Sequence, residues 1–396
     1  MVKLNLLGLL EDSRFIKVKK LRKKDCNHRL HWFIEDKDYF SRELLGIKQS
    51  ELKEMVKATH EVFDIYVDAT NKLLQANKLS YLDIPAFFHE CVHLSWQKRT
   101  ENPFLLGRFD INGGLNNLSP KIIEFNADTC TTIPETLRWQ EAQRKLCGSN
   151  TLQFNTLEAD LTRFFQQLKS SKSTENEVPT LLASTLGYVE DKNNVMSILD
   201  IANESSYDVY YADLEEVVFS KEEGIFHKVG DEYIKIDFWY KLIPWDWIFT
   251  YEKELAEILS EIVKNGLCTI LNPPYATVWQ NKKFMAYISE NFHSNYLAKT
   301  YLSKQSLNSY VEKPIYGRLG ENINIKMNAK NESTKGDFYN QQLIYQEYCP
   351  LDKDSESYYY QYGMFFSNNR ASSLNIRAQN NAIITDECEF MSHYII

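Results

Sequence analysis

The spacing of apolar residues predicts two helices in the first hundred residues. Between residues 50 and 79, apolar side chains such as Leu52 and Met55 recur every three or four positions. This spacing places them on one helical face. A second run with the same spacing covers residues 84–96. We therefore expect residues 1–105 to form a helical N-terminal region.

Short strands and turns replace the helical spacing beyond residue 105. Residues 107–111 and 121–126 read as strands, and turn-forming residues with two glycines lie between them, so the pattern predicts a hairpin. Thr132 and Glu135 then match the capping box that opens many helices. We expect residues 106–175 to form a unit of one hairpin followed by helices.

The middle of the chain alternates between strand-like and helical segments. Residues 180–186 favour a strand, and residues 195–202 and 251–263 favour helices. The polar residues 169–177 favour a surface loop. Alternation of this kind is typical of an α/β unit, which we expect over residues 176–270.

The last part of the chain is strand-like with polar insertions. Strand-like segments follow one another from residue 310, and the insertions cover residues 328–340 and 352–356. We expect a further unit over residues 271–396. Because helices and strands are both well represented, the complete pattern predicts a mixed α+β fold.

Composition and charge exclude several classes of protein. The 396 residues carry 45 Lys and Arg against 54 Asp and Glu, a net charge of −9, which argues against a general nucleic-acid-binding surface. No apolar run approaches the roughly 20 residues that a membrane-spanning helix needs. The seven cysteines include no CxxC pair, which fits a reduced compartment. We therefore expect a cytoplasmic protein without nucleic-acid or membrane partners.

Polar side chains on the predicted hairpin form a first candidate site. Because strand side chains alternate, Arg108 and Asp110 share one face of the first strand, and Glu124 and Asn126 share one face of the second. If the strands pair, two carboxylates and one amide oxygen can converge, and this donor set suits Mg²⁺. The arginine could stabilise phosphoryl or carboxylate charge. The pattern also fits a solvated hairpin edge with ordinary surface charges.

Two threonines extend this first candidate site beyond the hairpin. Thr129 and Thr131 lie just before the helix that the capping box predicts. The N-terminus of a helix favours anions, because its backbone N–H groups have no partner within the helix. We therefore expect these threonines near a bound anion.

A second candidate site combines two lysines with a glycine-containing turn. Lys282 follows a Trp-Gln-Asn segment, and Lys313 lies on a predicted strand that leads into Gly317 and Gly320. Glycines let a backbone approach phosphate oxygens, and a lysine supplies a positive charge to them. A further strand is expected over residues 343–348, where backbone groups could meet an adenine edge. The turn alone also fits a plain hairpin.

A short motif suggests a different chemistry. His89, Glu90 and His93 match the H-E-x-x-H pattern, in which two histidines on one helical face bind zinc and the glutamate acts as a base. No third ligand is marked in the sequence that follows. The alternative is a helix with two half-buried histidines, so a zinc hydrolase remains a lesser hypothesis.

Several motifs in the same order resemble a known family. The chain is similar to the synthetase domain of glutathionylspermidine synthase and its stand-alone bacterial relatives over nearly its whole length. The motifs that carry the resemblance are Leu106-Gly-Arg-Phe-Asp110, Lys121-Ile-Ile-Glu-Phe-Asn-Ala-Asp-Thr129, Lys241-Leu-Ile-Pro-Trp-Asp-Trp247, Trp279-Gln-Asn-Lys282, Val311-Glu-Lys-Pro314, Gly317-Arg-Leu-Gly320, Asn375-Ile-Arg377 and Ser392-His393.

The resemblance implies a fold and an activity. The family has an ATP-grasp fold with a pre-ATP-grasp-like α/β domain, and it consists of ATP- and Mg²⁺-dependent ligases. Such a ligase would activate a small-molecule or peptide carboxylate as an acyl phosphate and join it to an amine, for which a polyamine is one candidate. Neither the acid, the amine nor the oligomeric state can be read from the sequence.

The resemblance also implies a role for individual residues. Mg²⁺ would be held by Asp110, Glu124 and Asn126. Arg108 and Arg377 would be catalytic, at the transferring phosphate. The carboxylate substrate would contact Thr129 and Thr131. ATP would be bound by Lys282, Lys313, Gly317, Arg318, Gly320, Gln346 and Glu347. All of this requires Glu124 to lie beside Lys282 and Lys313 in one pocket.

Two departures from the family motifs bear on the activity. Leu319 replaces the glutamate of the usual Gly-Arg-Glu-Gly turn, and Ala378 follows Arg377 where the family often has glutamate. These changes leave the acids and lysines in place, but they affect the turn and the part of the site that would bind the amine acceptor. They motivate an alternative hypothesis, an ATP-binding relative without ligase activity.

Overall fold

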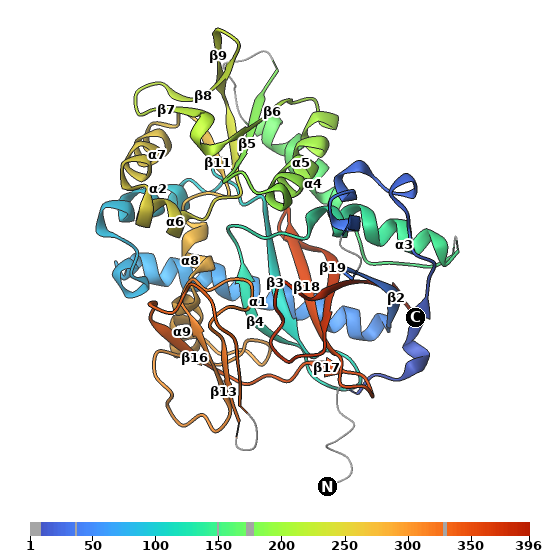
Figure 1. The fold of residues 1–396 in the computed structure, drawn as a ribbon. Coiled ribbons are helices and arrows are strands. Elements are labelled where there is room, and N and C mark those ends of the chain that lie inside the picture. The colour runs from blue at the N-terminus through green and yellow to red at the C-terminus, as the bar shows by residue number, and fades with distance from the viewer. Residues whose placement is uncertain (1–8, 36–37, 149, 172–177, 328–330) are drawn as a thin grey trace.

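The computed structural model describes residues 9–35, 38–148, 150–171, 178–327 and 331–396. Within these ranges, helices and four separate sheets occur together, so the mixed α+β prediction is confirmed. Figure 1 shows the largest sheet in the centre, a parallel sheet above it and a smaller antiparallel sheet at the lower left. In the described residues, no helix is both long and apolar enough to cross a membrane.

The largest sheet joins strands from distant parts of the chain. Its β2 and β20 pair in parallel and its other neighbours pair antiparallel, while β17 (Asp352–Lys353) pairs with β18 outside the main order. In spatial order the remaining strands are β1 (Phe15–Lys17), β2 (Phe40–Ile47), β20 (Glu389–Ile395), β19 (Arg370–Gln379), β18 (Tyr359–Ser367), β3 (Leu106–Asn112) and β4 (Lys121–Asn126).

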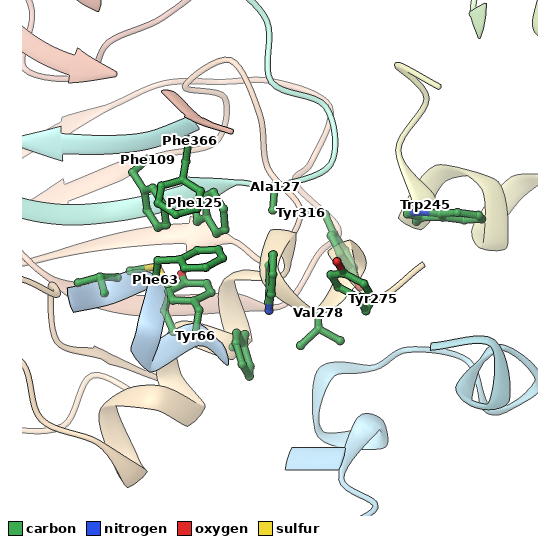
Figure 2. Close-up of a cluster of buried hydrophobic side chains, with 14 of the residues drawn as sticks. Phe63, Tyr66, Phe109, Phe125, Ala127, Trp245, Tyr275, Val278, Tyr316 and Phe366 are labelled. Carbon is green, nitrogen blue, oxygen red and sulfur yellow. The ribbon is translucent and has the colours of Figure 1, made fainter. Parts of the chain in front are cut away.

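A long helix, α1 (Gln49–Gln75), covers one face of this sheet. The rings of Phe109 and Phe125 stack with centroids 3.8 Å apart, and Tyr66 of α1 packs edge-on to both. Figure 2 shows these rings together, with Phe63 from the same helix. Because strand side chains alternate, burial of the two phenylalanines against α1 directs the intervening polar residues of β3 and β4 to the opposite face.

The parallel sheet forms a separate α/β layer. Helices α4 (Leu157–Ser171), α5 (Val189–Glu204), α6 (Trp245–Tyr251) and α7 (Lys253–Asn265) accompany it, and a three-stranded antiparallel sheet of β7 (Val217–Ser220), β8 (Gly224–Val229) and β9 (Glu232–Ile236) extends it. Its strands, in spatial order, are β11 (Thr269–Leu271), β10 (Phe238–Lys241), β5 (Thr180–Thr185) and β6 (Asp208–Asp213).

The third large sheet is antiparallel and packs on helix α9 (Lys282–Asn291), which follows α8 (Ala276–Gln280). Its strands, in spatial order, are β12 (Thr300–Tyr301), β16 (Leu343–Glu347), β13 (Tyr310–Pro314), β14 (Asn324–Lys326) and β15 (Asn331–Ser333). The other helices are α2 (His89–Gln97) and α3 (Gln140–Leu146), with a π-helical turn at Glu135–Trp139. Short 3₁₀ turns occur at Asp12–Arg14, Lys23–Asp25, His28–Leu30, Phe33–Glu35, Leu79–Leu82, Ala86–Phe88 and Leu214–Glu216.

Most of the predicted elements are present. The helix expected over residues 50–79, the hairpin strands and the strand–helix alternation of the middle region are confirmed as α1, β3, β4, β5 and α5. In addition to helices, the first 105 residues contribute β1 and β2 to the largest sheet.

Three local predictions are wrong in part. The helix expected over residues 84–96 begins only at His89, after a 3₁₀ turn. The surface loop expected over residues 169–177 starts inside α4, which continues to Ser171, and residues 172–177 lie outside the described part of the chain. The helix expected over residues 251–263 is present as α7, which runs from Lys253 to Asn265, whereas Tyr251 belongs to the end of α6.

The capping box is also wrong. The helix does begin at Ile133, directly after Thr132, but the π-helical turn that follows has no side-chain cap. Thr132 has a φ of 67°, and its hydroxyl accepts a hydrogen bond from Asn375 Nδ2 at 2.8 Å. The hydroxyl that the local motif needs is therefore engaged in a hydrogen bond with a residue far away in the sequence.

Candidate functional site

A cavity of about 450 Å³ lies where the largest sheet, the β10–α6 connection and the antiparallel sheet of β12 to β16 (the small antiparallel sheet) meet. Every site residue predicted from the two candidate sites and the family resemblance lines it. These residues are Arg108, Asp110, Glu124, Asn126, Thr129, Thr131, Lys282, Lys313, Gly317, Arg318, Gly320, Gln346, Glu347 and Arg377.

The β3–β4 hairpin supplies the acidic wall of the cavity. Its register sets Asp110 opposite Glu124 and Arg108 opposite Asn126. Arg108 Nε donates to Asp110 Oδ1 at 2.8 Å, and Asn126 Nδ2 donates to Asp110 Oδ2 at 3.1 Å. The hairpin therefore gathers two carboxylates and an amide on one face, beside a buried arginine.

Arg377 reaches the same carboxylate from two strands away. It lies on β19, and its Nη2 donates to Asp110 Oδ2 and to Gln361 Oε1, both at 2.6 Å. Gly363 lies on β18, the strand between β3 and β19, and a Cβ there would come within 2.7 Å of Arg108 Cδ. A glycine at this position thus leaves room for the Arg108 side chain beside Asp110.

The two arginines control the charge of Asp110. Burial alone would raise its pKa, because a buried carboxylate loses solvation. The positive charges and hydrogen bonds of Arg108 and Arg377 outweigh burial and lower the pKa of Asp110 to about 2. The carboxylate is therefore ionised at any physiological pH.

Lys282 connects the hairpin to the small antiparallel sheet. It is the first residue of α9, whose N-cap Asn281 accepts a hydrogen bond from the Lys283 backbone. Lys282 Nζ lies 2.8 Å from Glu124 Oε1 and donates to the carbonyl of Gly317 at 2.7 Å. The structure therefore brings Glu124 and Lys282 together, although 158 positions separate them in the sequence.

Lys313 lies on β13 and is held by the neighbouring strand. Its Nζ donates to Gln346 Oε1 of β16 at 2.7 Å. Burial lowers the pKa of Lys313 to about 8, although the charge of Glu124 acts in the opposite direction and Lys282 lowers the pKa further. Gln346 also donates to Thr300, so its side chain positions the lysine.

The turn over residues 317–320 approaches the cavity from the parallel-sheet side. Arg318 forms an ion pair with Asp246 at the start of α6. Leu319 and Gly320 both have positive φ, of 54° and 70°. A Cβ at Gly320 would collide with the carbonyl of Ile384, so this position requires glycine.

Buried contacts hold the segment that carries Thr129 and Thr131 in place. Asp128 is buried and its Oδ1 lies 2.8 Å from Lys241 Nζ, while its Oδ2 accepts from the Trp245 backbone at 2.6 Å. Gln280 Oε1 accepts from the backbone of Ala127 and Asp128, at 2.9 and 3.1 Å. These contacts fix the threonine segment against β10 and α8.

Several cavity residues have no local signal in the sequence. Gln361 becomes recognisable only through its contact with Arg377, and Asp246, which is outside the cavity lining, only through its contact with Arg318. Asp191 also lines the cavity, and burial together with the neighbouring Glu190 raises its pKa to about 6. Two acids at the start of a helix are common because they favour the helix dipole, so the sequence did not single them out.

The zinc hypothesis is wrong for the described residues. Among them, no group of three His, Cys, Asp or Glu side chains could hold a metal ion. His89 Nε2 is engaged with the backbone carbonyl of Ile84 at 2.7 Å, and Glu90 lies 3.9 Å from Lys264. Neither residue lines the cavity described above, and nor does His93.

Comparisons with known proteins agree with one another. Over residues 16–396 the chain matches the family described as "Glutathionylspermidine synthase preATP-grasp". A Haemophilus influenzae protein named "Putative acid--amine ligase" is 22% identical over 361 residues, which cover 88% of each chain. The "Bifunctional glutathionylspermidine synthetase/amidase" of Escherichia coli is 24% identical over 341 residues, covering 79% of this chain and 53% of that protein. This chain thus spans about half the length of that bifunctional relative.

A solved structure supports the same fold. It is a glutathione synthetase-like effector, GSS30, from Globodera pallida, which superposes with a TM-score of 0.53 over 90% of each chain at 8% sequence identity. At that identity the likeness concerns the fold alone. Because the family match extends over nearly the whole sequence, the chain belongs to the glutathionylspermidine synthase preATP-grasp family.

Proposed function

We propose that this protein is an ATP- and Mg²⁺-dependent ligase that joins a carboxylate to an amine. The observation that carries the proposal is the 2.8 Å ion pair between Glu124 and Lys282, which unites the acidic hairpin and the basic strand region in one cavity. Relatives named as an acid–amine ligase and as a glutathionylspermidine synthetase support the same reaction class.

The basic residues of the cavity fit a triphosphate. Lys282 at the start of α9 and Lys313 on β13 line it, together with Arg108, Arg318 and Arg377. In the described part of the chain, the Nε atoms of Arg318 and Arg377 are buried without a hydrogen-bond partner. Buried unpaired donors are costly, and phosphate oxygens would satisfy them.

ATP would lie between the small antiparallel sheet and the hairpin, which is the arrangement of an ATP-grasp fold. The backbone of Gln346 and Glu347, at the end of β16, would meet the adenine edge. The Gln346 side chain is already bound to Lys313, so we assign it the positioning of that lysine.

The hairpin fits Mg²⁺ held jointly with phosphate. Asp110, Glu124 and Asn126 offer two carboxylates and one amide, all hard oxygen donors. Mg²⁺ characteristically takes only one or two carboxylates and completes its shell with phosphates and waters. When bound, the ion would neutralise phosphate charge. Lys282 and Arg377, which now pair with the two acids, would then be available to the nucleotide.

The proposed reaction has two steps. A carboxylate oxygen of the acid attacks the γ-phosphorus of ATP, the bond to the β–γ bridging oxygen breaks, and ADP leaves. The ammonium form of the amine gives up one proton to solvent, and its nitrogen then attacks the acyl carbon. The C–O bond to phosphate breaks, inorganic phosphate leaves and the nitrogen loses a second proton. Arg108 and Arg377 stabilise charge on the transferring group, while Thr129 and Thr131 orient the carboxylate.

The remaining walls serve the second step. Asp191 lines the same cavity and would offer a negative charge for a cationic amine. The turn over residues 317–320 lines the cavity and would close over the acyl phosphate to keep water from it. The departure at Ala378 lies in the buried core, on a strand position that does not line the cavity. Leu319 is therefore the departure that bears on substrates.

The test is ADP release from ATP by the purified protein, with Mg²⁺ and a panel of acids, including glutathione, and amines, including spermidine. Asp110→Asn and Glu124→Gln should lower kcat/KM by about a hundredfold or more, because they remove charge stabilisation at the reacting phosphate. Glu254→Gln, an exposed acid of α7, is the matched control and should leave the rate unchanged.

Folding must be retained in each variant, as judged by circular dichroism. Full ADP release by the Asp110 and Glu124 variants would contradict the proposed site. Nucleotide binding with no ADP release for any pair of acid and amine would instead favour the ATP-binding relative without ligase activity.

A further inference from the structure

Three large apolar side chains line the cavity beside the β10–α6 connection and the turn over residues 317–320. Leu186 and Leu319 are 36% and 59% exposed, and Trp247 is half-buried. Large apolar side chains left open inside a polar cavity are a cost unless a ligand covers them. The proposed phosphate chemistry uses none of the three.

The fold draws these residues to one wall. The backbone of Leu242 donates to the carbonyl of Ser184 at 3.0 Å, which sets the residues after β5, including Leu186, beside the β10–α6 connection. That connection continues through Pro244, another cavity residue, into α6, which carries Trp247.

The turn over residues 317–320 is fixed to the same wall. The ion pair between Arg318 and Asp246 holds this turn against the first turn of α6. Leu319, the next residue, is therefore presented beside that helix. Its φ of 54° is uncommon for a leucine. Because its side chain is mostly exposed, burial within the protein offsets little of this backbone cost.

An acidic side chain of α5 lines the cavity together with these apolar residues. Asp191 lies on α5, five residues beyond Leu186, and lines the same cavity. After burial itself, the charges of Cys130, Asp128 and Asp191 all raise the pKa of the buried Tyr240 hydroxyl. Asp191 therefore lies within electrostatic reach of the segment that bears the carboxylate-binding threonines.

We propose that the amine substrate is a primary amine with an apolar alkyl or aryl group, whose cationic head is drawn to Asp191 and whose apolar part covers Leu186, Trp247 and Leu319. The inference rests on the proposed ligase function and names its acceptor. A polyamine fits this wall poorly, because each further ammonium along its length would lose water against leucine and tryptophan. An unbroken hydrocarbon segment gains from the same contact.

The experiment compares two amines of similar length, n-octylamine and spermidine, with an acid that supports ADP release. The wild-type protein should show a kcat/KM at least about tenfold higher for octylamine, which is the size of preference that a hydrophobic pocket supports. Leu319→Glu should lower that ratio by about tenfold or more, and Leu319→Ala should lower it less.

Leu152→Glu is the matched control, since Leu152 is 66% exposed and does not line the cavity. It should leave the ratio unchanged. Higher kcat/KM for spermidine in the wild type, or a ratio that Leu319→Glu does not alter, would overturn the inference while the ligase function stands.

Amine binding provides a readout that does not depend on turnover. Octylamine titrated calorimetrically into the protein with a non-hydrolysable ATP analogue should bind more tightly than spermidine, and Leu319→Glu should weaken octylamine binding alone. If octylamine binds in this way without ADP release for any acid, the ligase function fails and the apolar subsite stands. Absence of octylamine binding overturns the subsite.

Discussion

At the scale of single residues, the site depends on charges whose ionisation is set by burial and by their neighbours. Asp110 stays ionised because two arginines outweigh the loss of solvent, whereas Lys313 is shifted toward its neutral form. Both effects have the same origin, since a buried charge is stable only where an opposite charge is close. A triphosphate would supply that opposite charge to the lysine.

Nucleotide binding should therefore be coupled to proton uptake. At about pH 8.5, Lys313 is partly neutral in the free protein, and a bound triphosphate should raise its pKa and protonate it. Calorimetric titration with ATP in phosphate and in Tris should give different apparent enthalpies, because the two buffers release a proton with different heats.

The control for this measurement is Lys313→Arg. An arginine stays charged throughout this range, so the two buffers should then agree. Equal enthalpies in both buffers for the wild type would mean that the lysine does not meet the phosphates.

At the scale of secondary-structure elements, the ion pair between Asp128 and Lys241 joins the threonine segment to β10 and α6. Both side chains are almost completely buried, at 1% and 0% side-chain exposure. Burial lowers the pKa of the lysine and raises that of the aspartate, and each partner partly restores the other. The pair therefore fixes the relative position of two cavity walls.

Removing one partner of the ion pair should lower the free energy of unfolding more than removing both. Lys241→Met leaves an uncompensated buried carboxylate and should lower the free energy of unfolding by about 3–5 kcal/mol. The double variant Asp128→Asn with Lys241→Met should recover part of that loss, because no buried charge remains. Urea denaturation of the wild type, both single variants and the double variant measures the coupling, and simple additivity would contradict it.

At the scale of the whole molecule, the cavity is assembled from three layers that the chain visits in a scattered order. Local patterns predicted much of each layer, since alternation in β3 and β4 places the acids on one face and the glycines mark the turn. Contacts between layers could not be predicted in this way. Arg377 meets Asp110 only because β18 lies between their strands, a register that no local pattern encodes.

The failed capping box has the same explanation. Thr132 and Glu135 carry the motif, but Asn375 from β19 occupies the threonine hydroxyl, and Glu135 instead accepts a hydrogen bond from Tyr39. Glu135 and Tyr39 are 96 residues apart, so the winning partner lies far outside the motif. Only the resemblance to the family indicated that site residues from different layers belong to one site.

Global stability should depend on pH through a carboxylate remote from the proposed chemistry. Burial raises the pKa of Asp352 to about 8, although hydrogen bonds from Tyr362 and the Leu115 backbone oppose the shift. An unfolded aspartate has a pKa of about 4. The stability that protonation contributes is therefore complete below about pH 4 and is lost as the pH rises through about 8, by at most about 1.4 kcal/mol per pH unit.

Asp352→Asn removes this titration and should become more stable than the wild type as the pH rises from about 5 to about 8. Thermal unfolding across that range measures the difference in Tm. The exposed Asp231→Asn should show no such trend. A constant difference between Asp352→Asn and the wild type at all pH values would contradict the assignment.

The position of β20 has a consequence for synthesis. The strand formed by residues 389–395 lies between β2, near the beginning of the chain, and β19, which carries Arg377. While the polypeptide is still emerging from the ribosome, the hairpin acids and both lysines are already made, yet the sheet that holds them together has a missing member. A nascent chain therefore has the parts of the proposed nucleotide site before β20 joins its neighbours, and we expect the pocket to form fully only once β20 has been made.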